Sequence, residues 1–308
     1  MMSIQVAFLG TAASVPTSER SLPAVLIQRG NEQLMFDCGE GVQRQMIKAK
    51  AGFHKKTKVF ISHMHGDHVL GLPGLLQTMA LMDRQRPVEI YGPEGTKRFL
   101  EGTREVLQFA LTFPVEIHEI HTTGIICSEE EYTVEATWAN HVIPSLAYAF
   151  VEKPRAGKFY PDKARALGVP EGELWSKLQH DEQVKLANGR VVKPEAVLGS
   201  LRRGRKIVYS GDTKPFEGFA RFAAGADLVI HEATLDDALA EKAAEDGHST
   251  PSQAAEAAAK AKAKKLVLTH ISARYADARV LLEQAQKIFK NTVVAEDFMR
   301  LELPLLDS

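Results

Sequence analysis

The chain has 308 residues, of which 44% are hydrophobic and 25% are charged, as in a globular protein with a sizeable core. No segment approaches the roughly 18 uninterrupted apolar residues of a membrane helix, and the N-terminal residues lack the basic region and cleavage site of a signal peptide. The two cysteines provide neither a disulfide framework nor a Cys-x-x-Cys zinc site. We therefore expect a soluble cytoplasmic protein with no membrane partner, in which histidine and carboxylate groups hold any metal ion.

Short runs rich in Val, Ile and Leu alternate with amphipathic stretches, which is the pattern of a layered α/β protein. The expected strands, in chain order, are residues 5–9, 24–28, 33–36, 58–61, 88–91, 132–136, 146–151, 206–209, 228–230, 266–269 and 293–295. Two helices are also expected. One begins at the N-cap Thr250, with Pro251 in the first turn, and runs to about Lys264; the other spans residues 276–289.

Polar side chains follow five of these strands. The strands lead into Asp37, His63, Asp212, His231-Glu232 and His270. Because the loops beyond one edge of an α/β sheet form its usual binding site, we expect these groups to share one centre.

The densest cluster is the run Ser62-His63-Met64-His65-Gly66-Asp67-His68. A single buried histidine is usually a structural residue, but three histidines and an aspartate within six positions predict a metal site. Two ions need two sets of ligands and a bridging carboxylate. The sequence supplies His63, His65 and His141 for one ion, Asp67, His68 and His270 for the other, and Asp212 between them. Imidazole and carboxylate ligands suit zinc or manganese.

This ligand pattern resembles the metallo-β-lactamase superfamily over nearly the whole chain. Within that superfamily the chain is similar to the ribonuclease Z family through Phe36-Asp37-Cys38-Gly39-Glu40-Gly41, Gly71-Leu72-Pro73-Gly74, Ser210-Gly211-Asp212-Thr213, His231-Glu232-Ala233-Thr234, His248-Ser249-Thr250 and Thr269-His270-Ile271-Ser272-Ala273-Arg274-Tyr275. The resemblance implies an αββα sandwich with a protruding arm, two Zn²⁺ ions per subunit and a homodimer. It also implies an endoribonuclease that removes the 3′ trailer of precursor tRNA, leaving a 3′-hydroxyl on the tRNA and a 5′-phosphate on the trailer.

Three residues are expected to carry the chemistry. Asp67, a ligand near the attacking water, is the natural proton acceptor. By resemblance, His248 donates a proton to the departing 3′-oxygen. Glu232 would fix the tautomer of His248 and raise its pKa.

Other residues have supporting roles or none. We expect Asp37 to hydrogen-bond a ligand histidine, with capping of the Gly39–Gly41 turn as the alternative. Arg20 and Arg274 are candidate substrate contacts. His231 is interpreted as structural, and His54, His118, His121 and His180 have no assigned role.

Residues 152–205, here called the insertion, differ in composition from the rest. Residues 152–206 carry 13 Lys and Arg against 7 Asp and Glu, a net charge of +6, whereas the remainder carries 25 against 32, a net charge of −7. Repeated Pro and Gly residues and little apolar content predict a mobile arm, with a hairpin over 183–192 turning at Asn188-Gly189. The family's tRNA-gripping arm lies in this interval, although a charged, solvated insertion is the alternative.

Two other functions remain open at this point. One is a small-molecule ester or phosphodiester hydrolase of the same superfamily, and the other is a non-catalytic, metal-stabilised RNA-binding module. The pair of Glu232 and His248, together with the basic insertion, favours the ribonuclease, because a small ester has no evident need for either.

Overall fold

The computed structural model describes residues 3–305, which form two compact units. One unit, here called the body, contains residues 3–129, 133–150 and 206–304. The other contains residues 130–132, residues 151–205 and residue 305, and it therefore includes the whole insertion.

The body contains two mixed sheets, each with seven strands within residues 3–305. The first has the order β18 (Arg300–Leu303), β1 (Ile4–Gly10), β3 (Ala24–Arg29), β4 (Glu32–Phe36), β5 (Lys56–Phe60), β6 (Val88–Gly92) and β7 (Val115–Glu119). Its strands are antiparallel from β18 to β4 and parallel from β4 to β7.

The second sheet has the order β17 (Thr292–Val294), β15 (Leu266–Thr269), β14 (Leu228–Glu232), β13 (Lys206–Tyr209), β10 (Ser145–Glu152), β9 (Tyr132–Ala139) and β8 (Gly124–Ser128). Strands β13, β14, β15 and β17 are parallel. Their carboxyl ends therefore lie at one edge of the sheet.

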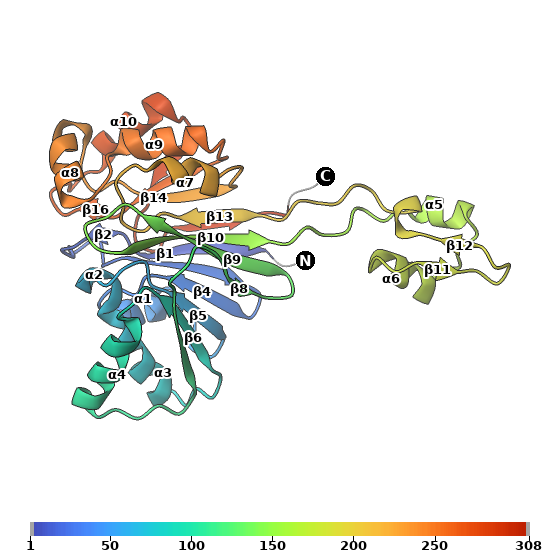
Figure 1. Cartoon of the computed structure of the whole chain (residues 1–308), viewed down its shortest axis with the longest axis horizontal. Coiled ribbons are helices and arrows are strands. Elements are labelled where there is room, and N and C mark those ends of the chain that lie inside the picture. Colours follow the sequence, from blue (N-terminus) through green and yellow to red (C-terminus); the bar gives the residue numbers. More distant parts are fainter. Residues whose placement is uncertain (1–2, 306–308) are drawn as a thin grey trace. The chain divides into compact units, whose positions relative to one another are not determined.

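Helices cover the outer face of each sheet (Figure 1). Helices α1 (Val42–Lys48), α3 (Gly71–Leu81) and α4 (Thr96–Leu107) lie against the first sheet, and α7 (Glu217–Phe222), α9 (Pro251–Lys260) and α10 (Arg279–Ile288) lie against the second. The short helices α2 (Gly66–Val69) and α8 (Ala240–Asp246) and the paired strands β2 (Ala12–Ala13) and β16 (Ile271–Ser272) complete the body.

Buried aromatic rings join the two sheets. Phe36 and Phe60 of the first sheet meet Tyr148 and Tyr209 of the second, with centroid distances of 5.9 Å for Phe36–Tyr209 and 5.5 Å for Phe60–Tyr148. Large apolar rings of this kind supply much of the stability of a layered core. The predicted αββα sandwich is confirmed.

The expected strands all form, with ends shifted by a few residues. The sequence missed β7, β8 and β18, as well as the two-residue strands β2 and β16. The two expected helices also form, but α9 ends at Lys260 and α10 begins only at Arg279. Thr250 caps α9 as predicted: its hydroxyl accepts the backbone N–H of Gln253, whose side chain accepts the N–H of Thr250.

The insertion contains α5 (Pro161–Ala166), α6 (Glu173–Gln179), the hairpin β11 (Val184–Lys185) and β12 (Val191–Val192), and the 3₁₀ turn η1 (Pro194–Ala196). Although its apolar residues are few, the insertion has a small core of its own; its mobility stays a prediction. Its buried members are Ala164, Val169, Leu178, Val184, Leu186, Val192 and Val197, packed against Phe159 and Trp175 among others. These residues come from several short elements, so no periodic pattern reveals them in the sequence.

Candidate metal centre

Strand ends bring the predicted ligands together. The loop after β5 carries His63 and His65, and the short helix α2, which follows it directly, carries Asp67 and His68. His141 follows β9, and Asp212 and His270 follow the parallel strands β13 and β15. The convergence arises because parallel strands deliver their carboxyl ends to one edge.

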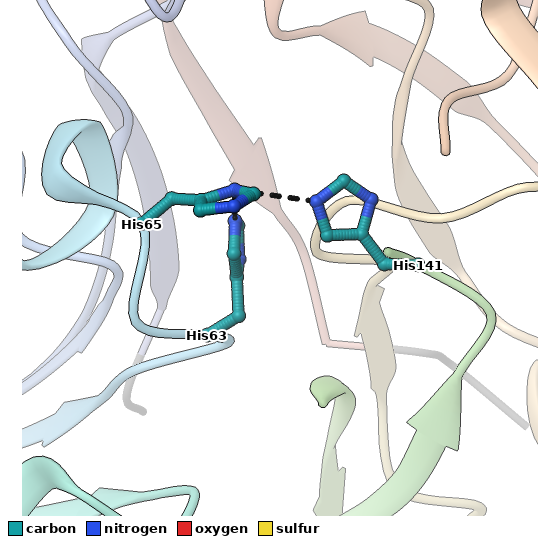
Figure 2. A group of neighbouring side chains, drawn as sticks. All are labelled: His63, His65 and His141. Carbon is teal, nitrogen blue, oxygen red and sulfur yellow. Dashed lines mark hydrogen bonds between the residues drawn. The ribbon is translucent and has the colours of Figure 1, made fainter. Parts of the chain in front are cut away.

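Three imidazoles form one group of possible ligands. Nδ1 of His65 lies 3.0 Å from Nε2 of His63 and 3.3 Å from Nε2 of His141. Figure 2 shows that His63 and His65 come from the same loop, whereas His141 approaches from another segment. His63 is fully buried, and the other two rings are partly exposed.

A second group lies beside the first. Nε2 of His68 is 3.3 Å from Nε2 of His270 and 3.3 Å from Oδ2 of Asp67, and His270 is 3.5 Å from the same Asp67 oxygen. Asp67 Oδ2 also accepts the backbone N–H of Ser14 at 2.9 Å.

Asp212 lies between the two groups. Its Oδ2 is 3.3 Å from Nε2 of both His68 and His270, and 3.7 Å from Nε2 of His63. Its Oδ1 is buried and has no hydrogen-bond donor. A buried carboxylate oxygen without a partner is costly, so a cation at this position would compensate it.

Hydrogen bonds on the outer side fix the histidine tautomers. His68 donates from Nδ1 to Oδ2 of Asp37 at 2.7 Å, and His141 donates from Nδ1 to the Gly247 carbonyl at 2.8 Å. Ser62 has one hydroxyl proton and gives it to Asp37 at 2.8 Å, because a carboxylate only accepts; His63 therefore donates from Nδ1 to Ser62 at 2.9 Å. Outer partners of this kind direct the remaining nitrogen of each ring toward a metal ion.

The charges in the centre also favour cations. Burial lowers the pKa values of His63, His65 and His141, so these rings are neutral and suited to coordination. Burial opposes a charge on His68 as well, yet Asp212 and Asp37 raise its pKa well above the usual value. The same buried carboxylates that raise the pKa of His68 also favour a cation in the centre.

Glu232 and His248 form a buried pair next to the centre. Nδ1 of His248 donates to Oε1 of Glu232 at 2.9 Å, and lies 3.9 Å from Oδ2 of Asp212. Burial lowers the pKa of His248, but the Glu232 carboxylate overrides this effect and raises the pKa to about 9. His248 is therefore protonated at neutral pH.

Sequence reasoning missed three hydroxyl groups that support the centre. Besides Ser62, Tyr209 donates to Oδ2 of Asp37 at 2.6 Å, and Thr234 contacts both Glu232 and His270. In the sequence, only their nearness to functional residues could have indicated them: Ser62 precedes His63, and Thr234 follows Glu232 by two positions.

The remaining candidates lie apart from the ligands. Arg20 donates to Thr11 at 2.7 Å and to the Ala295 carbonyl at 2.5 Å, and Arg274 is exposed and contacts Ser272. His231 is buried against Phe219 and donates to the Glu232 carbonyl. His54, His118, His121 and His180 are exposed and outside the clusters of possible ligands within residues 3–305.

Comparison with known proteins defines the class. Residues 174–271 match the model of the β-lactamase superfamily domain, and residues 4–151 match the model described as anti-Pycsar protein Apyc1. The structure of human tRNase Z, short form, superposes with a TM-score of 0.73 at 34% identity, covering 97% of this chain and 99% of that chain. Together with the two sheets, these matches define a hydrolase of the metallo-β-lactamase fold, which implies use of divalent metal ions.

The family within this class follows from closer relatives. A protein named ribonuclease Z from Methanosarcina acetivorans is 47% identical over 302 residues, which is 98% of each chain. Another of that name from Archaeoglobus fulgidus is 42% identical over 310 residues and covers 100% of both chains. This chain belongs to the ribonuclease Z family, as its motifs predicted, and is a metal-dependent endonuclease that hydrolyses phosphodiester bonds. No helix among residues 3–305 has the length and apolar character needed to cross a membrane.

Proposed function

We propose that the protein is a zinc-dependent endoribonuclease that cleaves the 3′ trailer from precursor tRNA, leaving a 3′-hydroxyl on the tRNA and a 5′-phosphate on the trailer. The observation that carries this proposal is the combination of seven converging ligand groups with the adjacent Glu232–His248 pair. Relatives over nearly the whole chain share the name ribonuclease Z, which disfavours the small-molecule hydrolase considered above.

The ligands suit two Zn²⁺ ions per subunit, with Mn²⁺ as the alternative. His63, His65 and His141 would hold one ion and Asp67, His68 and His270 the other, with Asp212 shared between them. The three groups His63, His65 and His141 present only nitrogen, which favours zinc. Bound ions of this kind supply Lewis acidity and lower the pKa of a water molecule enough to make it a nucleophile at neutral pH.

Asp67 is suited to accept the proton of that water. Burial alone would raise its pKa, but contacts with His270 and His68 hold the pKa well below its usual value, so the side chain is an ionised acceptor. The Ser14 N–H that binds its Oδ2 also restricts the orientation of the carboxylate. Asp37 would act indirectly, by holding His68 through the 2.7 Å hydrogen bond.

His248 would donate a proton to the departing 3′-oxygen of the tRNA. This role needs a group that is protonated at neutral pH, and its pKa of about 9 meets that need. Glu232 is itself held by the backbone N–H of Thr213 at 2.8 Å, so the proton donor is attached to a fixed support.

The insertion is the proposed binding surface for the body of precursor tRNA, because a net positive segment attracts the phosphate backbone. In the same proposal, Arg20 and Arg274 of this protein contact the tRNA substrate. The homodimer and the cytoplasmic location are predictions from the sequence that sedimentation and cell fractionation would test.

The decisive experiment is to map the 3′ ends that the purified, zinc-loaded protein produces. Precursors with and without an encoded CCA end should be compared, with a small phosphodiester as the competing substrate. A single cut at the 3′ side of the acceptor stem is the expected result. Efficient hydrolysis of the small ester without any cleavage of precursor tRNA would overturn the proposal.

A further inference from the structure

Thr234 has two polar partners that belong to different parts of the centre. Its buried hydroxyl lies 2.7 Å from Oε2 of Glu232 and 2.8 Å from Nδ1 of His270. A hydroxyl has a single proton, and an ionised carboxylate can only accept. Thr234 therefore donates to Glu232, and His270 donates from Nδ1 to Thr234.

The direction of these hydrogen bonds has two consequences. With its proton on Nδ1, His270 keeps the lone pair of Nε2 for the metal side, 3.3 Å from Asp212. Glu232 accepts the Thr234 hydroxyl on Oε2, while its Oε1 accepts both His248 at 2.9 Å and the backbone N–H of Thr213 at 2.8 Å. The Thr234 hydroxyl thus connects the candidate metal ligand His270 with Glu232, which holds the proposed proton donor His248.

A second hydroxyl in the centre provides a natural contrast. Ser62 also lies between a histidine and a carboxylate, but the carboxylate is Asp37, which holds the further ligand His68. Ser62 therefore connects one ligand histidine with another and has no hydrogen bond to His248 or Glu232. Both hydroxyl groups accept from a histidine and donate to a carboxylate, but only the carboxylate bound by Thr234, Glu232, holds His248.

We propose that Thr234 is a positioning residue that fixes both the tautomer of His270 and the orientation of Glu232. Metal binding through His270 and proton donation through His248 then depend on the same hydroxyl. The proposal deepens the proposed function and rests on it for the proton-donation half only. The metal-binding half concerns the ligand set itself.

The test compares Thr234→Val, which keeps the shape but lacks the hydroxyl, with Thr234→Ser, which keeps the hydroxyl. Zinc affinity of the metal-free full chain is measured by competition with a chromophoric chelator. Loss of an outer hydrogen bond to a ligand histidine typically weakens metal binding about 10- to 100-fold, so we expect a loss in this range for Thr234→Val and little change for Thr234→Ser. Ser62→Ala should lose affinity in the same way.

Proton donation is then measured at saturating zinc with two precursor tRNAs, one normal and one with sulfur in place of the departing 3′-oxygen. The thiolate leaves without a proton when the P–S bond breaks, so a defect in proton donation disappears with this substrate. We expect Thr234→Val to lose about tenfold or more in kcat with the normal substrate and to recover with the sulfur substrate. The activity of His248→Ala, relative to wild type, should recover likewise with the sulfur substrate. At saturating zinc, the activity of Ser62→Ala relative to wild type should be the same with both substrates.

Equal losses for Thr234→Ser and Thr234→Val would overturn the proposal, because they would indicate a packing role. Unchanged zinc affinity and kcat in Thr234→Val would overturn it as well. If the wild-type chain does not cleave precursor tRNA, the proposed function fails, but the chelator assay still decides the metal-binding half. Should Thr234→Val fail to fold, wild-type behaviour of Thr234→Ser together with defects in Thr234→Ala, checked by circular dichroism, would support the proposal, and defects in both would overturn it.

Discussion

Replacing Glu232 by glutamine should move the pH dependence of cleavage. The Glu232 carboxylate, with smaller contributions from Asp212 and Asp246, raises the pKa of His248 from 6.5 to about 9 even though burial acts against it, a difference of roughly 3 kcal/mol. Glutamine keeps the size of the side chain but removes the charge. Burial is then opposed only by the more weakly coupled Asp212 and Asp246, and the pKa of His248 should fall toward its ordinary value.

The expected size of the effect follows from the protonated fraction of His248. A group with a raised pKa holds its proton below that pKa and loses it as the pH rises through it. At pH 8, a pKa of about 9 leaves roughly 90% of His248 protonated, whereas a pKa of 6.5 leaves about 3%. Glu232→Gln should therefore lose up to about 30-fold in kcat at pH 8 but less than about twofold from this cause at pH 6.

The assay is single-turnover cleavage of precursor tRNA between pH 6 and 9.5 at saturating zinc. Because the positive ions oppose a charge on His248, the basic limb of the wild-type profile should lie at or below pH 9. Glu256→Gln, an exposed change on α9, is the matched control and should retain the wild-type profile. A deficit in Glu232→Gln that is equal at all pH values would refute the reasoning.

Four further predictions follow from the same structure. Asp67→Ala should abolish cleavage of both precursor tRNA and a small phosphodiester; turnover of either substrate would exclude the proposed proton acceptor. Deleting residues 154–203 keeps the buried pair of Glu152 and Arg205, 2.6 Å apart, and should weaken tRNA binding while small-ester hydrolysis persists; unchanged tRNA affinity would exclude the insertion as a binding surface. Affinity of the full chain for tRNA should fall steeply as salt rises from 50 to 200 mM in filter binding, as phosphate contacts require; a flat response would contradict the electrostatic argument. Phe60→Ala should lower the free energy of unfolding in urea by about 3–5 kcal/mol, since the ring is fully buried between the sheets, and a loss below about 1 kcal/mol would mean that the core tolerates the cavity.

The sequence predicted the buried strands well because burial on both faces gives an almost continuous apolar run. Strands such as β15 (Leu266–Thr269) are buried at every position. The missed strands β7 and β18 lie at the ends of the first sheet and alternate buried or half-buried residues with exposed ones. Their weaker apolar signal resembles that of a loop.

The convergence of the candidate ligand groups could be predicted because their residue types are distinctive and their positions follow strand ends. Among the groups that orient them, Asp37 was expected to hydrogen-bond a ligand histidine and does bond His68, but the hydroxyl groups were not predicted. Ser62, Tyr209 and Thr234 are of common residue types, and the contact between Tyr209 and Asp37 joins positions 172 residues apart. Only the packing of one sheet on the other creates that contact, so no local pattern contains it.

The placement of the ligands on two different sheets has a consequence for biosynthesis. His68 and His270 lie 202 residues apart in the chain, yet their Nε2 atoms are 3.3 Å apart. A ribosome must therefore release His270 from its exit tunnel, and the second sheet must pack on the first, before the complete ligand set exists. Nascent chains carry the His63–His68 loop long before this stage, and in them any bound ion has only some of its ligands. We therefore expect the centre to bind its full complement of metal only after both halves of the body have folded.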